Sequence, residues 1–144
     1  MNLQPIEDFH LEKCAALFAA VFNSPPWNET WSQEIALGRL QDCYSMPGSY
    51  GIVAIKKDRI LGFAIGHTET WYEGKHFFLK EMCIQSTQQR SGIGTKIIDM
   101  LYQQLINQGV SIIYLLTMRD SPAAAFYEKC GFSHHSKMIM MTKK

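Results

Sequence analysis

The sequence predicts a fold of the α/β (α+β) class, with a mixed and mostly antiparallel central sheet flanked by about four helices. Three observations support this prediction. Two strand-like runs, residues 50–55 and 60–70, are separated by a short turn, which is typical of an antiparallel hairpin. A glycine-rich turn joins a third strand-like run, residues 77–84, to a segment with helical periodicity. A fourth apolar run, residues 112–117, is followed directly by a short helical segment.

The N-terminal third of the chain predicts a short leading strand and two helices. Pro25-Pro26 ends the first helix, whose apolar residues recur at helical spacing: Leu11, Cys14, Ala15, Phe18, Val21 and Phe22. Thr30 and Gln33 suggest a capping box at the start of the second helix. Pro47-Gly48 ends that helix, and its apolar face consists of Ala36, Leu40, Cys43 and Tyr44.

Three antiparallel strands and a final strand complete the predicted sheet. Lys57-Asp58-Arg59 is the turn of the first hairpin, and Glu73-Gly74-Lys75 is the turn before the third strand. Simple alternation along this third strand places Leu79, Glu81 and Cys83 on one face and Lys80, Met82 and Ile84 on the other. The last strand is expected from His134 to Met141.

Length and charge limit the classes of function. A chain of 144 residues that is 47% hydrophobic can bury one ordinary core, so residues 1–144 are expected to form a single domain. The formal net charge is +1, and positive and negative residues are interspersed. A nucleic-acid partner or a membrane surface therefore has little electrostatic support.

Cysteine usage and the N-terminus predict a cytoplasmic protein without a metal. Cys14, Cys43, Cys83 and Cys130 are scattered and match neither zinc spacing nor a disulfide framework. The N-terminal region is acidic where a signal peptide would be basic and then apolar, and no apolar run approaches the length of a membrane span.

The glycine-rich turn is the most informative motif. It can direct several backbone N–H groups and the positive end of a helix dipole toward one anion, and its residues are Gln89, Arg90, Ser91, Gly92, Ile93, Gly94 and Thr95. The spacing matches neither the Walker motif nor the dinucleotide fingerprint. The alternative interpretation is an ordinary glycine turn that caps a surface helix.

A second motif gives the turn a family context. Ser121 suits a helix N-cap and Pro122 the first helical position, and the helix continues into Phe126-Tyr127-Glu128-Lys129-Cys130-Gly131-Phe132. This segment, together with Gln-x-x-Gly-x-Gly one strand earlier, resembles the GCN5-related N-acetyltransferase (GNAT) superfamily. The resemblance is close over Phe77 to Phe132 and rests on element order elsewhere. The chain departs from the family at its end, where only a dozen residues follow Phe132.

The resemblance implies a sheet of about six to seven strands and a binding site for acetyl-CoA. It assigns the pyrophosphate to the glycine turn and the pantetheine amides to the backbone of Met82, Cys83 and Ile84, which splay from the neighbouring strand. Asp120 stands where the family usually has Asn, and its carboxylate cannot donate to the pantetheine arm as an amide can. Ser121 can replace the missing donor. No metal is implied.

Acetyl transfer to an amine needs a base for the amine and an acid for the departing thiolate. The resemblance gives the acid role to Tyr127, whose ordinary pKa is about 10; the alternative is that this ring only packs on the sheet. Glu81 is the candidate base, because burial of a carboxylate on a mostly apolar strand raises its pKa. Its alternatives are an exposed Glu paired with a Lys, and deprotonation of the amine by solvent.

The acceptor amine is expected to contact the segments least like the family. Trp27, Glu29 and Trp31 lie in one such segment, and Trp71 and Tyr72 in another. Aromatic faces and carboxylates together hold a cation well. The alternative for Trp27 and Trp31 is a hydrophobic staple for the second helix, which is favoured for Trp31.

The sequence therefore predicts an acetyl-CoA-dependent N-acetyltransferase that modifies the primary amine of a small molecule by direct attack in a ternary complex. An aminoglycoside, a polyamine and an amino-acid derivative all remain compatible as acceptor, and both a monomer and a homodimer remain open. Leu115 stands where some peptide α-amino acetyltransferases carry a Glu, which weakens a ribosomal-protein substrate. A non-catalytic acyl-CoA sensor and a generic nucleotide-binding domain are the competing functional interpretations.

Overall fold

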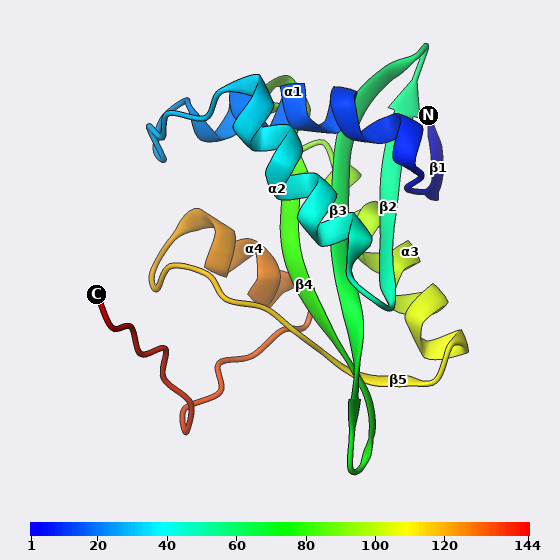
Figure 1. Ribbon diagram of the computed structural model, residues 1–144, viewed down its shortest axis with the longest axis vertical. Helices are drawn as coiled ribbons and strands as arrows, with labels where there is room; N and C mark the ends of the chain where they lie inside the picture. The colour runs from blue at the N-terminus through cyan, green and yellow to red at the C-terminus, as the bar shows by residue number, and fades with distance from the viewer.

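A computed structural model describes residues 1–144, and Figure 1 shows its architecture. The N-terminal elements are β1 (Asn2–Pro5), the 3-10 turn η1 (Asp8–His10), α1 (Leu11–Phe22) and α2 (Gln33–Ser45). Three long strands follow, which are β2 (Ser49–Lys56), β3 (Arg59–Trp71) and β4 (Gly74–Ile84). The chain continues through η2 (Ser86–Gln88), α3 (Ile93–Asn107), β5 (Val110–Tyr114) and α4 (Pro122–Lys129).

The sheet has five strands in the order β1-β2-β3-β4-β5. All neighbouring pairs are antiparallel except β4 and β5, which are parallel because α3 connects them. The mixed, mostly antiparallel sheet and the four helices confirm the predicted class. The predicted count of six to seven strands was too high.

The expected last strand, His134 to Met141, does not form. A strand needs a hydrogen-bonded neighbour, and the backbone bond within this stretch is a local turn from the Met138 N–H to the His135 carbonyl, 3.3 Å. Four consecutive apolar side chains are therefore left exposed, namely Met138, Ile139, Met140 and Met141.

The two faces of the sheet are covered by different helices (Figure 1). α1 and α2 cover one face, where Phe18, Leu40 and Phe63 belong to one buried cluster. α3 covers the other face, where Phe77 and Ile97 belong to a second cluster, against which residues of α4 pack. The sheet therefore separates two cores, and the end of β4 has one core on each side.

A β-bulge changes which side chains of β4 share a face. Ile65 pairs with Glu81 and Gly66 pairs with Leu79, so Lys80 is the extra residue. Leu79 consequently packs in the α3 cluster, with Met82 and Ile84 against the same cluster. Cys83 instead packs in the α1 and α2 cluster. The predicted grouping of Leu79 with Glu81 and Cys83 was wrong, because simple alternation does not anticipate the inserted residue.

The second helix also begins with a different cap from the one predicted. Ser32, rather than Thr30, is the N-cap of α2, and its hydroxyl accepts a hydrogen bond from the Ile35 N–H, 3.1 Å. The Asn23 side chain holds the preceding segment by bonds to the Trp31 backbone N–H and carbonyl, 2.7 and 2.9 Å. This contact fixes the residue directly before the N-cap.

Candidate active site

The site begins where β4 and β5 separate. Their parallel pairing covers only Lys75–Phe78 of β4 and ends at Tyr114 of β5. β4 continues to Ile84 and stays paired with β3 alone. The predicted strand at 112–117 thus begins earlier, at Val110, and ends earlier, at Tyr114. Met82, Cys83 and Ile84 lie on the length of β4 that has no strand partner on the β5 side.

The glycine turn supplies free backbone donors. Gly92 is the N-cap of α3 with a φ of 88°, and Arg90 also has a positive φ of 68°. No side chain caps the helix, and the first helical backbone bond runs from Lys96 to the Gly92 carbonyl. The amides of Gly92, Ile93, Gly94 and Thr95 therefore have no backbone acceptor. Four free N–H groups at a helix N-terminus are suited to bind an anion.

Gly94 has a packing role that the sequence did not reveal. A Cβ atom at this position would lie 3.0 Å from the ring carbon Cζ of Phe126 and 3.6 Å from the terminal methyl of Met82. The absence of a side chain at Gly94 therefore lets α3 approach α4 closely. A Cβ atom at Gly92 would meet no atom within 4 Å. Only the positive φ requires glycine at Gly92.

Glu81 lies at the end of β4 on the α1 and α2 side. Its side chain is 18% exposed, and burial raises its pKa from 4.5 to about 7. The carboxylate atom Oε1 is 3.8 Å from Arg39 Nη2, while Oε2 is buried without a hydrogen-bond partner. The positive charge of Arg39 opposes the effect of burial on the pKa, whereas the negative charge of Glu29 adds to it. An unpartnered carboxylate oxygen with a pKa near neutrality can accept a proton.

Tyr127 lies in the same region, on α4. Its ring packs edge-on against Phe126 and Phe132, with centroid separations of 5.3 and 5.5 Å. Burial raises the pKa of the Tyr127 hydroxyl, and the negative charge of Glu81 raises it further. The hydroxyl therefore stays protonated at neutral pH and can donate. The structure brings the two sequence-predicted catalytic residues within electrostatic range of each other.

The start of α4 restricts one predicted contact. Ser121 is the N-cap, as predicted, and its hydroxyl accepts from the Ala124 N–H, 3.1 Å, while it donates to the Met118 carbonyl, 2.7 Å. Its single proton is used within the chain. Ser121 therefore does not supply the replacement donor that the sequence suggested. Asp120 is exposed, with a φ of 58°.

The predicted aromatic wall is divided between two places. Trp31 packs edge-on against Phe18, with centroids 4.8 Å apart, and its indole N–H donates to Glu29, 2.8 Å. The rings of Trp27 and Phe22 are also in contact, with centroids 5.1 Å apart.

Trp71 and Tyr72 instead lie at the end of the long β3–β4 hairpin, which projects beyond the helices (Figure 1). Trp71 is six residue steps along β3 from Ile65, the partner of Glu81, which corresponds to roughly 20 Å of strand. The two groups therefore do not form one wall.

Sequence reasoning missed a polar cluster on β3 and β5. The Tyr114 hydroxyl donates to Glu69 Oε1, 2.6 Å, and His67 Nε2 lies 3.3 Å from Glu69 Oε2. Phe78 stacks on Tyr114 with centroids 4.5 Å apart. These hydrogen bonds outweigh burial and lower the pKa of Glu69. Arg39 was missed as well, although its spacing from Ala36 and Cys43 put a cation on the apolar face of α2.

The site contains no group of three or more His, Cys, Asp or Glu arranged to hold a metal ion. None of the helices combines the length and the apolar character that a membrane span requires.

Solved structures with the same fold include aminoglycoside acetyltransferases. One is meta-AAC0020 from an uncultured soil metagenomic sample in complex with sisomicin, with 19% identity, 99% of this chain and 95% of that chain covered, and a TM-score of 0.77. Another is AAC(6')-Iy in complex with CoA, with 15% identity, 99% and 94% coverage, and a TM-score of 0.77. A third is the integron cassette protein VCH_CASS6 from the mobile metagenome of V. cholerae, with 17% identity, 99% and 91% coverage, and a TM-score of 0.82. No curated protein matches the sequence significantly.

At these identities the structural likeness establishes the fold, and the family comes from the sequence match. The model of the acetyltransferase (GNAT) family matches residues 11–132. This range includes α1, the splayed end of β4, the glycine turn and Tyr127, and it ends at Phe132. The chain belongs to the acetyltransferase (GNAT) family.

Proposed function

We propose that the protein is an acetyl-CoA-dependent N-acetyltransferase that modifies the primary amine of a small molecule by direct attack in a ternary complex. One observation carries this proposal. Glu81, with a pKa raised to about 7, lies near the end of β4, and its negative charge contributes to the raised pKa of the protonated Tyr127. This end of β4 has no strand partner on the β5 side and leads into a turn of free backbone N–H groups. A base, an acid and an anion site thus adjoin one another, as transfer from a thioester to an amine requires.

The proposed cofactor site is supported by backbone N–H donors that have no acceptor within the chain. Bound acetyl-CoA would supply an activated acetyl group as a thioester. The free amides of Gly92, Ile93, Gly94 and Thr95 would hold its pyrophosphate, with Gln89, Arg90 and Ser91 beside them, because these amides have no acceptor in the chain. The backbone of Met82, Cys83 and Ile84, which pairs with β3 but has no strand partner on the β5 side, would hold the pantetheine amides in the manner of an added strand.

The acid and base roles follow from the environments of the two side chains. Glu81 would take the proton from the incoming ammonium group, because a carboxylate with a pKa near 7 is half ionised at neutral pH and binds a proton well when ionised. Tyr127 would donate its proton to the departing thiolate, since its hydroxyl remains protonated and forms no hydrogen bond that lowers its pKa. A buried, unpartnered Oε2 on Glu81 is more easily explained by this role than by packing.

The acceptor would lie on the α1 and α2 side of β4. Glu81 faces that side, and Glu69 lies farther along the neighbouring strand β3, where it accepts a hydrogen bond from Tyr114 of β5. Carboxylates beside aromatic rings favour a cationic amine. The aminoglycosides acetylated by structural neighbours are one such class, and a polyamine or an amino-acid derivative is equally compatible. We also propose that residues 1–144 act as one catalytic domain in the cytoplasm, as a monomer or a homodimer.

Two other functions compete with this proposal. A non-catalytic acyl-CoA sensor would keep the glycine turn but would not need the perturbed carboxylate at Glu81. A peptide N-acetyltransferase would use the same chemistry on a larger acceptor. The first test is therefore release of free thiol from acetyl-CoA in the presence of a panel of aminoglycosides, polyamines, amino-acid derivatives and peptides.

The catalytic assignment is tested with Glu81→Gln in the same assay. The variant should bind acetyl-CoA with nearly unchanged affinity and should turn over at least about a hundredfold more slowly, because only the base is lost. Glu34→Gln is the matched control, since it removes the same charge from an exposed position of α2. Binding of acetyl-CoA without thiol release for any amine or peptide would favour the sensor.

A further inference from the structure

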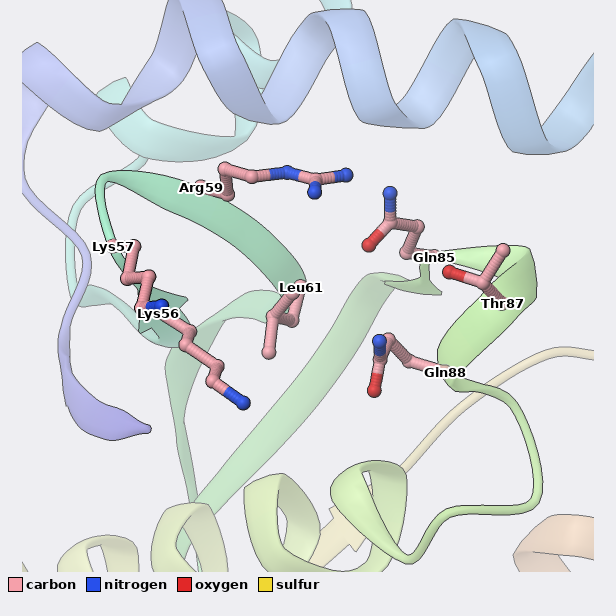
Figure 2. A pocket seen from close by; sticks show the side chains of 7 residues that line it. All are labelled: Lys56, Lys57, Arg59, Leu61, Gln85, Thr87 and Gln88. Carbon is pink, nitrogen blue, oxygen red and sulfur yellow. The ribbon is translucent and has the colours of Figure 1, made fainter.

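A cavity separate from Glu81 lies at the end of the sheet where the β2–β3 hairpin meets the segment after β4. Its volume is about 220 Å³. Lys56 and Lys57 come from the hairpin, Arg59 begins β3, and Gln85, Thr87 and Gln88 line the other side. Figure 2 shows Arg59 extending toward Gln85 and Lys56 on the side of Gln88, with Leu61 between them.

The charge around this cavity is unbalanced. Lys56, Lys57 and Arg59 line it, no acidic side chain does, and none of the three forms an ion pair. The chain as a whole has a net charge of only +1, so this concentration of cations is a local feature. Six of the seven lining residues are polar and can donate hydrogen bonds, which suits an anionic ligand.

The positions of two of these cations make the arrangement costly in the absence of a ligand. Lys56 and Arg59 are directly opposite each other in the antiparallel register of β2 and β3. Like charges in directly opposed positions destabilise a strand pair. An anion bound between them would relieve this repulsion. The two like charges do not stabilise the strand pair, so anion binding is a physical explanation for their presence at these positions.

The hairpin is held firmly enough to place these side chains. Lys57 and Asp58 form its turn with φ values of 49° and 63°, as in a tight two-residue hairpin turn. The Lys13 ammonium group donates to the Asp58 carbonyl, 3.0 Å, and the Gln85 N–H donates to the Leu61 carbonyl, 2.8 Å. Both walls of the cavity are therefore tied to neighbouring elements.

We propose that this cavity binds a phosphate monoester. The guanidinium group of Arg59 matches two phosphate oxygens in a bidentate contact, and the lysines supply charge from the other side. The phosphate can come from two sources. One is the 3'-phosphate of CoA, since Gln85, Thr87 and Gln88 directly precede the glycine turn, and this source rests on the proposed function. The other is a separate phosphorylated metabolite.

Calorimetry on the full chain tests the cavity first, with inorganic phosphate as the probe. Arg59→Gln and, separately, Lys56→Gln should weaken phosphate binding by at least about tenfold, or roughly 1.4 kcal/mol. Lys75→Gln is the control, because it removes the same charge from the exposed start of β4, at the opposite end of that strand. Each cavity variant should unfold at an equal or higher temperature than the wild type, because one member of the repelling pair is gone.

The source of the phosphate is then distinguished by comparing CoA with 3'-dephospho-CoA. If CoA supplies it, the wild type should prefer CoA by about tenfold or more, and Arg59→Gln should lose that preference. If a separate metabolite supplies it, the two cofactors should bind equally, and phosphate should still bind when CoA is saturating. Failure of CoA to bind at all would refute the proposed function but leave the phosphate result standing. Equal phosphate binding by the wild type and both cavity variants, with the same cofactor preference in each, would overturn the proposal.

Discussion

Arg39 Nη2 lies 3.8 Å from one carboxylate oxygen of Glu81, while the other oxygen is buried and has no partner. This asymmetry defines the electrostatics of the site. Burial favours the neutral acid, and the nearby guanidinium group favours the carboxylate, with burial the larger effect. The balance leaves the pKa at about 7, so small changes to either influence should alter the pH at which Glu81 ionises.

Removal of Arg39 should shift the pH dependence of activity. A base works when ionised, so the wild-type kcat/KM should rise with pH through an apparent pKa near 7. Arg39→Gln removes the charge that lowers the pKa of Glu81, and the acidic limb should therefore move to higher pH. The measurement is kcat/KM by thiol release from about pH 5 to about pH 9. Arg39→Lys, which keeps the charge, should shift the limb less; identical limbs in all three proteins would mean that Glu81 does not control it.

Glu81 should also make folding stability depend on pH. Its pKa in the folded protein, about 7, is above its ordinary value of 4.5, so the folded state binds the proton more tightly than the unfolded state. The contribution of Glu81 to the free energy of unfolding is therefore greatest at low pH. It decreases as the pH rises from about 4.5 through about 7, and the difference between the two pKa values corresponds to about 3 kcal/mol. Glu81→Gln removes this penalty.

The difference in melting temperature between Glu81→Gln and the wild type should consequently be larger at about pH 8 than at about pH 5. Thermal unfolding monitored by circular dichroism gives the comparison. Glu34→Gln, at an exposed position, should show no such change with pH. A constant difference across this range would show that the Glu81 carboxylate is better solvated than its burial suggests.

Tyr127→Phe should slow the chemical step without loosening α4. The variant keeps the ring that packs against Phe126 and Phe132 and removes only the hydroxyl. Turnover should fall by about a hundredfold or more, within the usual range for a general acid, while acetyl-CoA affinity stays nearly constant. Single-turnover kinetics provides the test, with Tyr102→Phe on the exposed side of α3 as the control. A Phe variant that reacts at the wild-type rate would return Tyr127 to a packing role.

The glycine turn allows an internally matched experiment. Gly92 and Gly109 both have a φ of 88°, and a Cβ atom at either would meet no atom within 4 Å. Substitution of either glycine by alanine should therefore destabilise the folded protein by a similar amount, because both positions require a positive φ. Only Gly92→Ala should also weaken acetyl-CoA binding, by at least about tenfold in calorimetry.

Gly94→Val is a less informative test of the turn, because the added side chain would clash with Phe126 and disturb packing as well as binding. Equal cofactor affinity in the two alanine variants would argue against an anion site at this turn.

Local patterns were sufficient where one segment determines its own structure. The apolar spacing from Leu11 to Phe22 predicted the helix that forms as α1, and Ser121 and Pro122 predicted the start of α4. The predicted turn at Lys57-Asp58-Arg59 likewise located the hairpin of β2 and β3, although Arg59 already belongs to β3. In each case the periodicity or the cap lies within a few residues along the chain, so no distant contact is needed to decide the outcome.

Tertiary contacts decided the features that join distant segments. The bulge at Lys80 reverses the faces of β4 around Leu79 and Glu81, and only the pairing with β3 reveals it. The proximity of Glu81 to Arg39 depends on how α2 packs on the sheet, and the separation of Trp71 from Trp27 depends on how far the β3–β4 hairpin extends. The sequence by itself determined the four helices and five strands that form, the glycine turn and the family, but it also predicted a strand at His134 to Met141 that does not form. The side chains that face one another were decided by strand register and helix packing, because those set the relative positions of residues far apart in the chain.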